Sequence, residues 1–493
     1  MVMENKDVVK REIESIVGPD NVSSDAPDLI PYLSDSYSAM MGRDIPLPDF
    51  VILPKTTDEV QKIVLLANKY EIPIYPRSFG VNIAGSALPY KRGAIVIDLK
   101  RMDRIMEINE DTMTATIEPG VSWGRLRKEA NKKGLDIIPI GGPYQTSPIG
   151  NHLLTNITPY SSKYSSDRAV TLKAVLPNGE ILRTGSWASA LGGDVNPYFR
   201  YAYGPDLTGM FRGSMGNFGI IVEMVERLRP LAPLENIISF GFDSLDKCMK
   251  AMQAIERLEF SRTCGAYNNI LTAHFLLAPH RIKTPGERER MLKKLPPFQI
   301  NLGLGGTEEM VALFERIAAE EAGNWDGYPV LLEGEDKILL DQVGEGASRG
   351  IMHMYAPFSG FAAVIGCLPI THVAEINDIV KNIVKKYDIR DPYSGEPQEH
   401  ELIIVPYDRC STVYVEQEIL YDPAADRSVL EPVMQCLREC YAEIVGKYGA
   451  SHTIPNKTLM KMMVPSYGNI LKGFKKMVDP KGIMLPGGPY SLE

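Results

Sequence analysis

The chain has 493 residues, of which 44% are hydrophobic and 23% charged, and a formal net charge of -9. The length suggests about two to four domains, and the composition excludes a disordered chain or a disulfide-stapled miniprotein. No apolar run approaches the ~20 residues of a membrane span, and the charged N-terminus has no apolar core of a secretory signal. The negative charge makes nucleic acid a poor partner.

The six cysteines form no CxxC pair, so the sequence indicates no zinc ribbon or iron–sulfur cluster and we predict no metal site. Cys436 and Cys440 would lie one turn apart on a helix. They could form a two-cysteine metal or redox site, but two small core residues on one helix face is the interpretation we favour. We therefore expect a reducing, cytoplasmic location. Separately, we expect an oligomer of like or unlike chains.

The first elements alternate between strand and helix. We predict an amphipathic helix over Val8–Val17 and a strand within Pro48–Lys55. Thr56 and Glu59 then form a capping box, followed by apolar residues at helical spacing. A short strand over Ile72–Tyr75 completes a small α/β unit.

The pattern then changes to β structure, with an Asn178-Gly179 hairpin turn in it. The predicted strands are Ala94–Ile97, Arg104–Asn109, Thr112–Glu118, Val170–Leu176, Ile181–Arg183 and a last strand from Gly219 to about Pro230.

A second region begins near Pro233. The predicted helices in it are Leu245–Leu258, Met310–Ala322 and Ala374–Lys386, and the predicted strands are Gly360–Leu368 and Glu401–Val405. The charged, proline-bearing segment Pro279–Pro297 is expected to be surface loop. We predict that Tyr467–Glu493 forms a helix followed by a tail rich in proline and glycine.

The stretch Pro76–Pro89, PRSFGVNIAGSALP, follows a strand and is crowded with small residues. Its backbone amides could form an anion-binding nest for a pyrophosphate. A tight turn beside a packed sheet would look similar. It matches neither a Walker loop nor a GxGxxG fingerprint.

Several further motifs follow this stretch in a fixed order. They are EPGV at 118–121, SPIGN at 147–151, YGPDLTGMF at 203–211, GSMGNFGIIV at 213–222 and VDPKGIMLPG at 478–487. In this order the elements resemble the FAD-binding domain of the vanillyl-alcohol oxidase/4-cresol dehydrogenase flavoprotein superfamily. The resemblance covers residues 47–231 and 470–488 and is weak between them.

The resemblance implies an α+β fold with FAD as the cofactor. A two-subdomain FAD-binding domain would span 47–231 after an N-terminal helical segment, 1–46. An α+β cap domain over 232–455 would cover the flavin, and 456–493 would return to the FAD domain. The implied cofactor-binding residues are Arg77, Ser78, Phe79, Gly80, Val81, Asn82, Ile83, Ala84, Gly120, Ser147, Gly150, Asn151, Gly219 and Ile221.

The motifs look most like the 4-cresol dehydrogenase branch, although DLTGMFRGSMGNFGII also resembles the glycolate and D-lactate dehydrogenase branch. The HxGDGNxH metal motif of that second branch is absent from the sequence. Pocket residues of the phenol-oxidising members are replaced here: Leu154 stands for an aspartate, Ser451-His452 for a Tyr-Arg pair, and Gly488 for a terminal cation. A phenolate would lack its charge partners, so we expect simple para-alkylphenols to be poor substrates.

Three residues are the acid/base candidates: His152, Glu401 and His452. Glu401 matches a carboxylate-bearing strand of the resembled family, but a structural ion pair remains an alternative. His400 alternates with Glu401, so only one of them can face a pocket.

We expect FAD to be held without a covalent bond, because the favoured alignment puts Val364 at the linkage position. A looser alignment would instead implicate His353 or Tyr355.

These observations predict an FAD-dependent dehydrogenase that moves a hydride from a hydroxylated or activated C–H substrate to flavin N5 and passes electrons to a protein acceptor. Such an acceptor would be a cytochrome, an iron–sulfur protein or an electron-transfer flavoprotein. One alternative is a 2-hydroxy acid dehydrogenase of the glycolate/D-lactate type. Another is an electron-relay or scaffold subunit of a larger complex.

Overall fold

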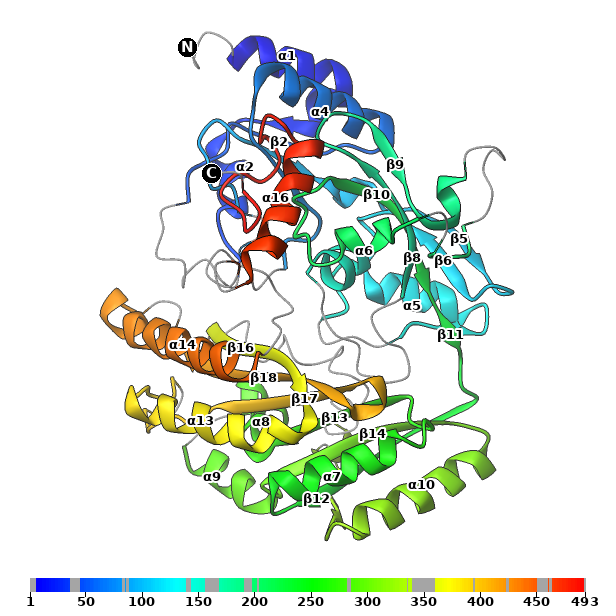
Figure 1. The fold of residues 1–493 in the computed structure, drawn as a ribbon, viewed down its shortest axis with the longest axis vertical. Coiled ribbons are helices and arrows are strands. Elements are labelled where there is room, and N and C mark those ends of the chain that lie inside the picture. Colours follow the sequence, from blue (N-terminus) through cyan, green and yellow to red (C-terminus); the bar gives the residue numbers. More distant parts are fainter. Residues whose placement is uncertain are drawn as a thin grey trace.

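The computed structural model describes most of the chain. The described residues are 6–35, 45–81, 85, 88–138, 143–155, 168–189, 197–201, 204–281, 285–334, 336–338, 360–392, 395–422, 425–449, 460 and 463–491. In Figure 1 the elements up to β11, together with the C-terminal helix, fill the upper part, and the elements between them fill the lower part. We call these the upper and lower regions.

A small sheet opens the upper region. Its strands, in spatial order, are β1 (Val22–Ser23), β2 (Phe50–Ile52), β4 (Ile95–Asp98) and β3 (Ile74–Arg77). Strands β2, β4 and β3 are parallel, and α1 (Lys6–Val17) and α4 (Thr57–Tyr70) bury their apolar faces in one cluster with them. The predicted α/β unit is confirmed.

Helix α4 begins where the capping box predicts. The Thr56 hydroxyl accepts a hydrogen bond from the Glu59 amide at 3.2 Å. The Glu59 carboxylate accepts one from the Lys55 amide at 2.6 Å, instead of from the Thr56 amide. The two bonds satisfy amides at a helix start that would otherwise lack partners.

A second, antiparallel sheet completes the upper region. Its strands, in spatial order, are β5 (Ile105–Asn109), β6 (Thr114–Ile117), β10 (Ile220–Arg227), β8 (Ala169–Val175) and β9 (Ile181–Arg183). All of its predicted strands are present, and Gly179 has the positive φ, 87°, that the turn between β8 and β9 requires. Helix α5 (Trp123–Asn131), which the sequence did not reveal, packs into the same buried cluster.

Two short strands, β7 (Leu135–Asp136) and β11 (Arg229–Pro230), pair with each other where the chain leaves the upper region. Two further short helices, α6 (Leu207–Phe211) and η4 (Ile149–Leu154), carry parts of the motifs.

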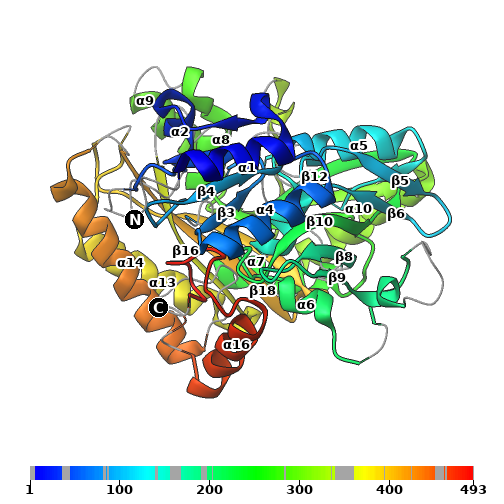
Figure 2. The ribbon, with the colours of Figure 1, turned by 90° about the horizontal axis from the view of Figure 1, so that it is seen from above.

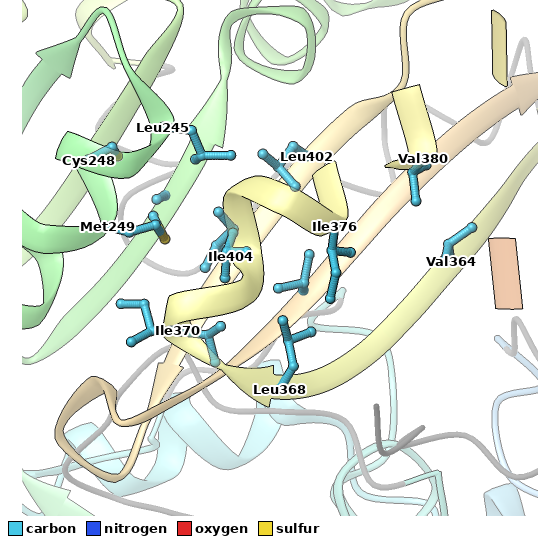
Figure 3. Close-up of a cluster of buried hydrophobic side chains, with 14 of the residues drawn as sticks. Leu245, Cys248, Met249, Val364, Leu368, Ile370, Ile376, Val380, Leu402 and Ile404 are labelled. Atoms are coloured by element: carbon cyan, nitrogen blue, oxygen red, sulfur yellow. The ribbon is translucent and has the colours of Figure 1, made fainter. Parts of the chain in front are cut away.

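The lower region is built on one antiparallel sheet. Its strands, in spatial order, are β15 (Tyr328–Pro329), β12 (Leu234–Phe242), β14 (Phe298–Gly306), β13 (Thr263–Asn268), β17 (Glu401–Tyr407), β18 (Thr412–Tyr421) and β16 (Gly360–Pro369). Four helices cover one face: α7 (Leu245–Glu256), α10 (Glu308–Gly323), α13 (Val373–Lys386) and α14 (Arg427–Tyr448). Figure 3 shows Ile376 and Val380 of α13 beside Val364 and Leu368 of β16 in this core.

The opposite face of the lower sheet carries a separate cluster. It joins Ile365, Ile403 and Val405 of the sheet to Met215 of the upper region. Helix α8 (Asn269–Arg281) packs on the same side through Leu271. This face of the sheet is therefore the one turned toward the upper region.

Pro279–Pro297 is not surface loop as predicted, because α8 runs to Arg281 and α9 spans Pro285–Lys294. Pro285 occupies the helix start, where its missing N–H costs nothing. Glu289 and Lys293 pair one turn apart at 3.0 Å, and Met291 and Leu295 are buried. The charges that suggested a loop lie on the solvent face of a helix.

The C-terminal segment returns to the upper region, as predicted. Helix α16 (Pro465–Val478) lies with the upper elements in Figure 1, and the view from above in Figure 2 shows it at the edge of the molecule, near α6. After it, Met484 forms a parallel bridge with Ile74, and the Leu485 amide donates to the Ile74 carbonyl at 3.0 Å. The chain is thus an α+β protein whose last strand-like segment extends its first sheet.

Cys436 and Cys440 are buried in the apolar core beneath α14, as the favoured interpretation predicts. Within the described ranges, no group of three or more His, Cys, Asp or Glu side chains is placed to hold a metal ion. Among these same residues, no helix is both long and apolar enough to cross a bilayer.

Candidate active site

Four chain segments of the upper region meet at one place. The amides of Gly213 and Met215 donate to the carbonyls of Leu153 and Leu154 at 2.9 and 3.1 Å, which ties the loop 213–219 to η4. A Cβ on Gly150 would lie 3.3 Å from Ser78 Oγ, so η4 also touches the turn after β3. The fourth segment is the C-terminal return at 484–488.

The C-terminal segment is fixed by a buried lysine. The Lys475 ammonium donates to the carbonyls of Asn217 and Met484 at 2.8 and 2.7 Å and pairs with Asp479 at 2.7 Å. Burial lowers the pKa of Lys475, and the Asp479 charge opposes this. Gly488 lies beside Asn217, since a Cβ there would be 3.1 Å from Asn217 Oδ1.

Several buried polar atoms around this convergence find no partner among the described residues. They are Arg77 Nη1, Ser147 Oγ, Ser214 Oγ and Asn217 Oδ1. Native structures leave few buried polar atoms unsatisfied, so such a group points to a polar ligand. Cationic, hydroxyl and amide groups on closely approaching backbone fit a dinucleotide with a pyrophosphate and a polar ring system.

The predicted cofactor residues occupy different positions around this site. Arg77, at the end of β3, lies 4.9 Å from the Tyr32 ring, and Ser78–Val81 follow it. Ser147, Gly150 and Asn151 lie in and just before η4, and the Trp123 indole donates to Asn151 at 3.4 Å. Asn82, Ile83 and Ala84 are outside the described residues.

Three of the predicted residues are held mainly by packing. The Gly120 amide donates to the Met102 carbonyl at 2.7 Å, and a Cβ on Gly120 would meet the Lys100 carbonyl oxygen at 2.6 Å. Gly219 precedes β10, and the Ile221 side chain is buried in the cluster that includes α5. Any contact of Ile221 with a dinucleotide would therefore use its backbone.

His152 is the predicted acid/base residue with the most defined surroundings. It is 1% exposed, and its Nδ1 lies 3.2 Å from Glu226 Oε2 on β10. Burial, followed by the charge of Arg168, lowers the pKa of His152 to about 4, although Glu226 opposes this. The ring is therefore neutral near pH 7, with Nδ1–H donating to the carboxylate. Its Nε2 is left as an acceptor with no partner among the described residues.

Arg168 lies beside this pair and is also 1% exposed. Its Nη1 donates to the Ile138 carbonyl at 3.0 Å, and its guanidinium lies 5.7 Å from the Trp123 ring. Arg168 Nε and Nη2, and Glu226 Oε1, have no hydrogen-bond partner in the described part of the chain. Burial lowers the pKa of Arg168 to about 10, and Tyr407 of β17 is one of the groups that oppose this. The cluster thus lies where the lower sheet meets the upper region.

Glu401 is on the face of the lower sheet turned toward the upper region. It is 1% exposed, contacts His274 Nδ1 and faces Glu418 across the β17–β18 pair. The Tyr414 hydroxyl donates to Glu416 at 2.6 Å on the same face. Burial raises the pKa of Glu416, with the charge of Glu401 contributing. Carboxyl groups of this kind can hold or release a proton near neutral pH.

His400 points the other way, as strand alternation predicts for one of the two. Its Nε2 lies 2.9 Å from Asn377 Oδ1 of α13, under the covering helices. Val364, the alignment's linkage position, also packs under these helices, in the cluster of Figure 3. His452, Ser451, His353 and Tyr355 are outside the described residues.

Sequence reasoning missed six residues that the structure places at the site. Ser214 and Asn217 lay inside a quoted motif and could have been chosen for their polarity. The others, Glu226, Arg168, His274 and Lys475, carry no local signal, because their partners are distant in sequence.

Comparisons with known proteins show what the chain as a whole resembles. Residues 48–185 match the family model described as FAD binding domain. The chain is 31% identical to glycolate oxidase subunit GlcD of Bacillus subtilis, over 98% of this chain and 97% of the relative. It is 25% identical to the 4-cresol dehydrogenase [hydroxylating] flavoprotein subunit of Pseudomonas putida, over 98% and 95%.

Among solved structures, the fold is similar to p-cresol methylhydroxylase with substrate bound. The TM-score is 0.85 at 20% identity, covering 99% of this chain and 97% of that one. The family-model match and the two relatives thus define an FAD-linked oxidoreductase. The chain belongs to the p-cresol methylhydroxylase/vanillyl-alcohol oxidase family of FAD flavoproteins, and its cofactor is FAD.

Proposed function

We propose that the chain is a dehydrogenase that oxidises a hydroxylated organic substrate at the carbon bearing the hydroxyl group. FAD, when bound, supplies the hydride acceptor, N5 of the isoalloxazine ring. Arg77, Ser147, Ser214 and Asn217 would hold the cofactor through their unpartnered polar atoms. The observation that carries the proposal is the buried His152–Glu226 pair, with a neutral ring and an Nε2 that has no hydrogen-bond partner among the described residues.

His152 Nε2 would take the proton of the substrate hydroxyl as the hydride leaves. A base must be unprotonated to do this, and a pKa of about 4 keeps the ring neutral over the whole neutral range. Glu226 fixes the tautomer through Nδ1–H and stabilises the positive charge that develops on the ring. The burial of both side chains excludes water from the proton path.

Glu401, which contacts His274, is the second acid/base candidate. It lies on the face of the lower sheet that is turned toward the upper region. The predicted role of His452 stays a prediction.

We further propose the divisions 1–46, 47–231, 232–455 and 456–493 as N-terminal, FAD, cap and returning segments. The change of sheet between β11 and β12 supports the boundary near 231.

A protein electron acceptor is supported by the names of the relatives, two of which are called subunits. An oligomer of like or unlike chains would follow from this. The six free cysteines support a reducing, cytoplasmic location.

A 2-hydroxy acid dehydrogenase is the second candidate, favoured by the 31% identity to the glycolate oxidase subunit. A relay or scaffold subunit without its own substrate is the third. Simple para-alkylphenols remain poor candidates, because Leu154 packs partly in the apolar cluster beside η4 and supplies no carboxylate.

The test is anaerobic flavin reduction by a panel of 2-hydroxy acids, aliphatic alcohols, 4-cresol and vanillyl alcohol. We expect His152→Gln to slow reduction by roughly 10²–10⁴-fold, the usual contribution of a positioned base. His400→Gln is the matched control, a second buried histidine with a pKa of about 4 that faces α13. It should reduce at the unaltered rate.

The rate of the unaltered protein should fall as pH drops through about 4, where His152 gains its proton. Unchanged reduction by the His152→Gln protein, with slow reduction by Glu401→Gln, would move the base to the lower sheet. No reduction by any alcohol or acid, together with reduction by a partner protein, would favour the relay. Fast, saturable reduction by 4-cresol would refute the substrate argument.

A further inference from the structure

The outer face of helix α16 has a composition that neither the cofactor nor the proposed chemistry explains. We propose that this face docks on a lipid surface that carries anionic headgroups. This role is separate from the proposed oxidation, because it uses the side of α16 that is turned away from the candidate site.

Helix α16 is anchored by its inner face. The Lys475 ammonium donates to the carbonyls of Asn217 and Met484 at 2.8 and 2.7 Å. The Phe474 ring meets the Phe218 ring edge to face, with 4.9 Å between their centroids. These contacts fix the rotation of the helix about its axis, so they determine which side chains face solvent.

An apolar stripe runs along the outer side of the helix. Ile470 and Met477 are 69% and 67% exposed, and Gly473 lies between them at helical spacing. Tyr467 and Val464 extend the stripe to the helix start and are 52% and 66% exposed. Single exposed apolar side chains are ordinary, but a row of them on one element marks an interaction surface.

Helix α14 shows that surface helices of this chain need not expose apolar residues in rows. Its outward positions are charged or polar and include Glu431, Gln435, Arg438, Glu443 and Lys447. Such a face is well solvated as it stands. The outer face of α16 is not, so burying it against another surface is favourable.

The charges beside the stripe are positive. Lys472 and Lys476 are exposed, and neither pairs with a carboxylate in the described part of the chain. Pro465–Val478 contains no Asp or Glu, and the next residue, Asp479, is buried against Lys475. The chain has a net charge of -9, but charges beyond ~8 Å are largely screened at physiological ionic strength. An approaching surface therefore meets a local positive charge.

A lipid surface fits these features better than a second copy of the chain does. Apolar side chains flanked by lysines are typical of helices that lie in a membrane interface, where the lysine stems reach back to the headgroups. A flat bilayer can be reached only by an element at the edge of the molecule, and Figure 2 shows α16 there. A second copy docked through its own α16 would bring like charges together, which is unfavourable.

The test is co-sedimentation of the FAD-loaded protein with vesicles of equal parts phosphatidylglycerol and phosphatidylcholine. Vesicles of phosphatidylcholine alone are the lipid control, and should bind about twenty- to thirty-fold more weakly, because each of the two lysines contributes at an anionic surface. Binding to the anionic vesicles should weaken in about 1 M salt, where charges more than ~3 Å apart are screened.

Three sets of α16 variants test the stripe and its lysines. Ile470→Ser with Met477→Ser should weaken binding at least about tenfold, since burial of either side chain alone is worth about that factor. Lys472→Ser with Lys476→Ser should weaken binding to anionic vesicles about twenty- to thirty-fold and leave binding to phosphatidylcholine unchanged. Gly473→Leu should tighten binding about tenfold, because nothing lies within 4 Å of its Cβ position and the new side chain would extend the stripe.

Two control variants make the same changes elsewhere. Val429→Ser removes a 55% exposed apolar side chain from α14. Lys62→Ser with Lys132→Ser changes the net charge equally, at lysines that pair with Asp58 and Glu129, each at 2.7 Å. Both controls should bind vesicles as the unaltered protein does. FAD content and thermal unfolding should be the same in all of these proteins, because every replaced residue is exposed.

No binding to anionic vesicles, or equal binding by the unaltered protein and the two serine double variants of α16, would overturn the inference. So would weaker binding by the Gly473→Leu protein, because the stripe would then not enter the lipid. Equal binding to both lipid compositions would overturn the anionic assignment. A lower molar mass of Ile470→Ser with Met477→Ser in lipid-free light scattering, with unchanged vesicle binding, would assign the stripe to a second copy. Vesicle binding needs no substrate, so failure of the proposed dehydrogenase would leave these results unchanged.

Discussion

The upper and lower regions bury their interiors in different ways. The lower sheet and its four helices share one large apolar cluster that runs from α7 to α14. The upper region has two smaller clusters, one on the first sheet and one around α5. The candidate site lies between them, because Ile149 and Leu153 belong to one cluster and Met484 and Leu485 to the other.

Unpartnered polar atoms gather at this seam. Ser147 Oγ and Ser214 Oγ find no hydrogen-bond partner among the described residues, and neither do single atoms of the lower region such as Gln299 Oε1 and His400 Nδ1. The upper-region atoms lie where four chain segments of that region meet, so we expect FAD to stabilise the upper region more than the lower one. Five measurements would break or sharpen this contrast.

The largest effect is expected at the junction of the two regions. Asp136 is fully buried and pairs with Arg229 at 3.0 Å and with Arg127 at 2.9 Å. Asp136→Ala would leave buried guanidinium charge unpaired, at a cost of about 3–5 kcal/mol in unfolding free energy. Denaturant unfolding measures it, with the exposed Asp103→Ala as control, expected to change stability by at most ~1 kcal/mol.

This junction also sets a pH dependence. Burial alone would raise the pKa of Asp136, but Arg229 and Arg127 hold it below its usual value. A lowered folded pKa means that the stabilisation is present above the unfolded pKa of about 3.9 and is lost as pH falls below it. As pH falls below this value, the Asp136→Ala protein should lose less stability than the unaltered protein does. An unchanged acid profile would show that the network adds nothing to stability.

Removing FAD should destabilise the upper region selectively. At a thousand times its Kd, a ligand adds about 4 kcal/mol to the stability of the state that binds it. Hydrogen exchange on the FAD-free protein should therefore speed up in β3 and β10 and change little in β17 and β18. Equal acceleration in all four strands would show that the regions unfold together and that the contrast has no energetic meaning.

Replacing a glycine with alanine should lower stability where backbone atoms crowd the glycine, and should change stability little where nothing lies near it. A Cβ on Gly120 would lie 2.6 and 2.7 Å from the Lys100 and Met102 carbonyl oxygens, which are backbone and cannot move aside cheaply. We expect Gly120→Ala to cost about 1–3 kcal/mol and to lower FAD content. Gly323→Ala in α10 is the control, since nothing lies within 4 Å of its Cβ position. A Gly120→Ala protein with full stability and flavin content would contradict the packing role.

The same contrast governs how much could be predicted from the sequence. Upper-region strands and turns were found because a cofactor requires glycines and tight turns at fixed places, and these are local signals. In the lower region β12, β13, β14 and β18 were missed. Strand β14 is buried along most of its length on both faces, so it shows no alternation of polar and apolar residues.

The sequence could predict only those site residues that lie in or next to a recognisable motif. His152 stood out because it follows the SPIGN motif, but its partner Glu226 lies 74 residues away. His274 carries no local signal in the sequence, because its partner Glu401 is 127 residues away. Arg168 carries no local signal in the sequence, and it is noticed in the structure because it is buried while its Nε and Nη2 have no hydrogen-bond partner among the described residues.

The smallest effect is a matched pair of helix caps, one in each region. The Thr56 hydroxyl accepts from the Glu59 amide at 3.2 Å, and the Thr307 hydroxyl accepts from the Met310 amide at 3.3 Å. Replacing either threonine with alanine removes one amide partner and should cost about 1 kcal/mol. Threonine-to-serine changes keep the hydroxyl and serve as controls.

Bound FAD should offset the stability lost with one cap but not the stability lost with the other. Helix α4 packs on the first sheet, beside the site, whereas α10 packs only within the lower region. Excess FAD should therefore offset the loss in Thr56→Ala, through its preference for the folded upper region, and leave the loss in Thr307→Ala unchanged. Thermal unfolding followed by flavin fluorescence reports the upper region, and circular dichroism reports both. Equal shifts for the two variants, with equal rescue by FAD, would mean that one cooperative unit spans the whole chain, with the cofactor stabilising the lower sheet through the Met215 contact.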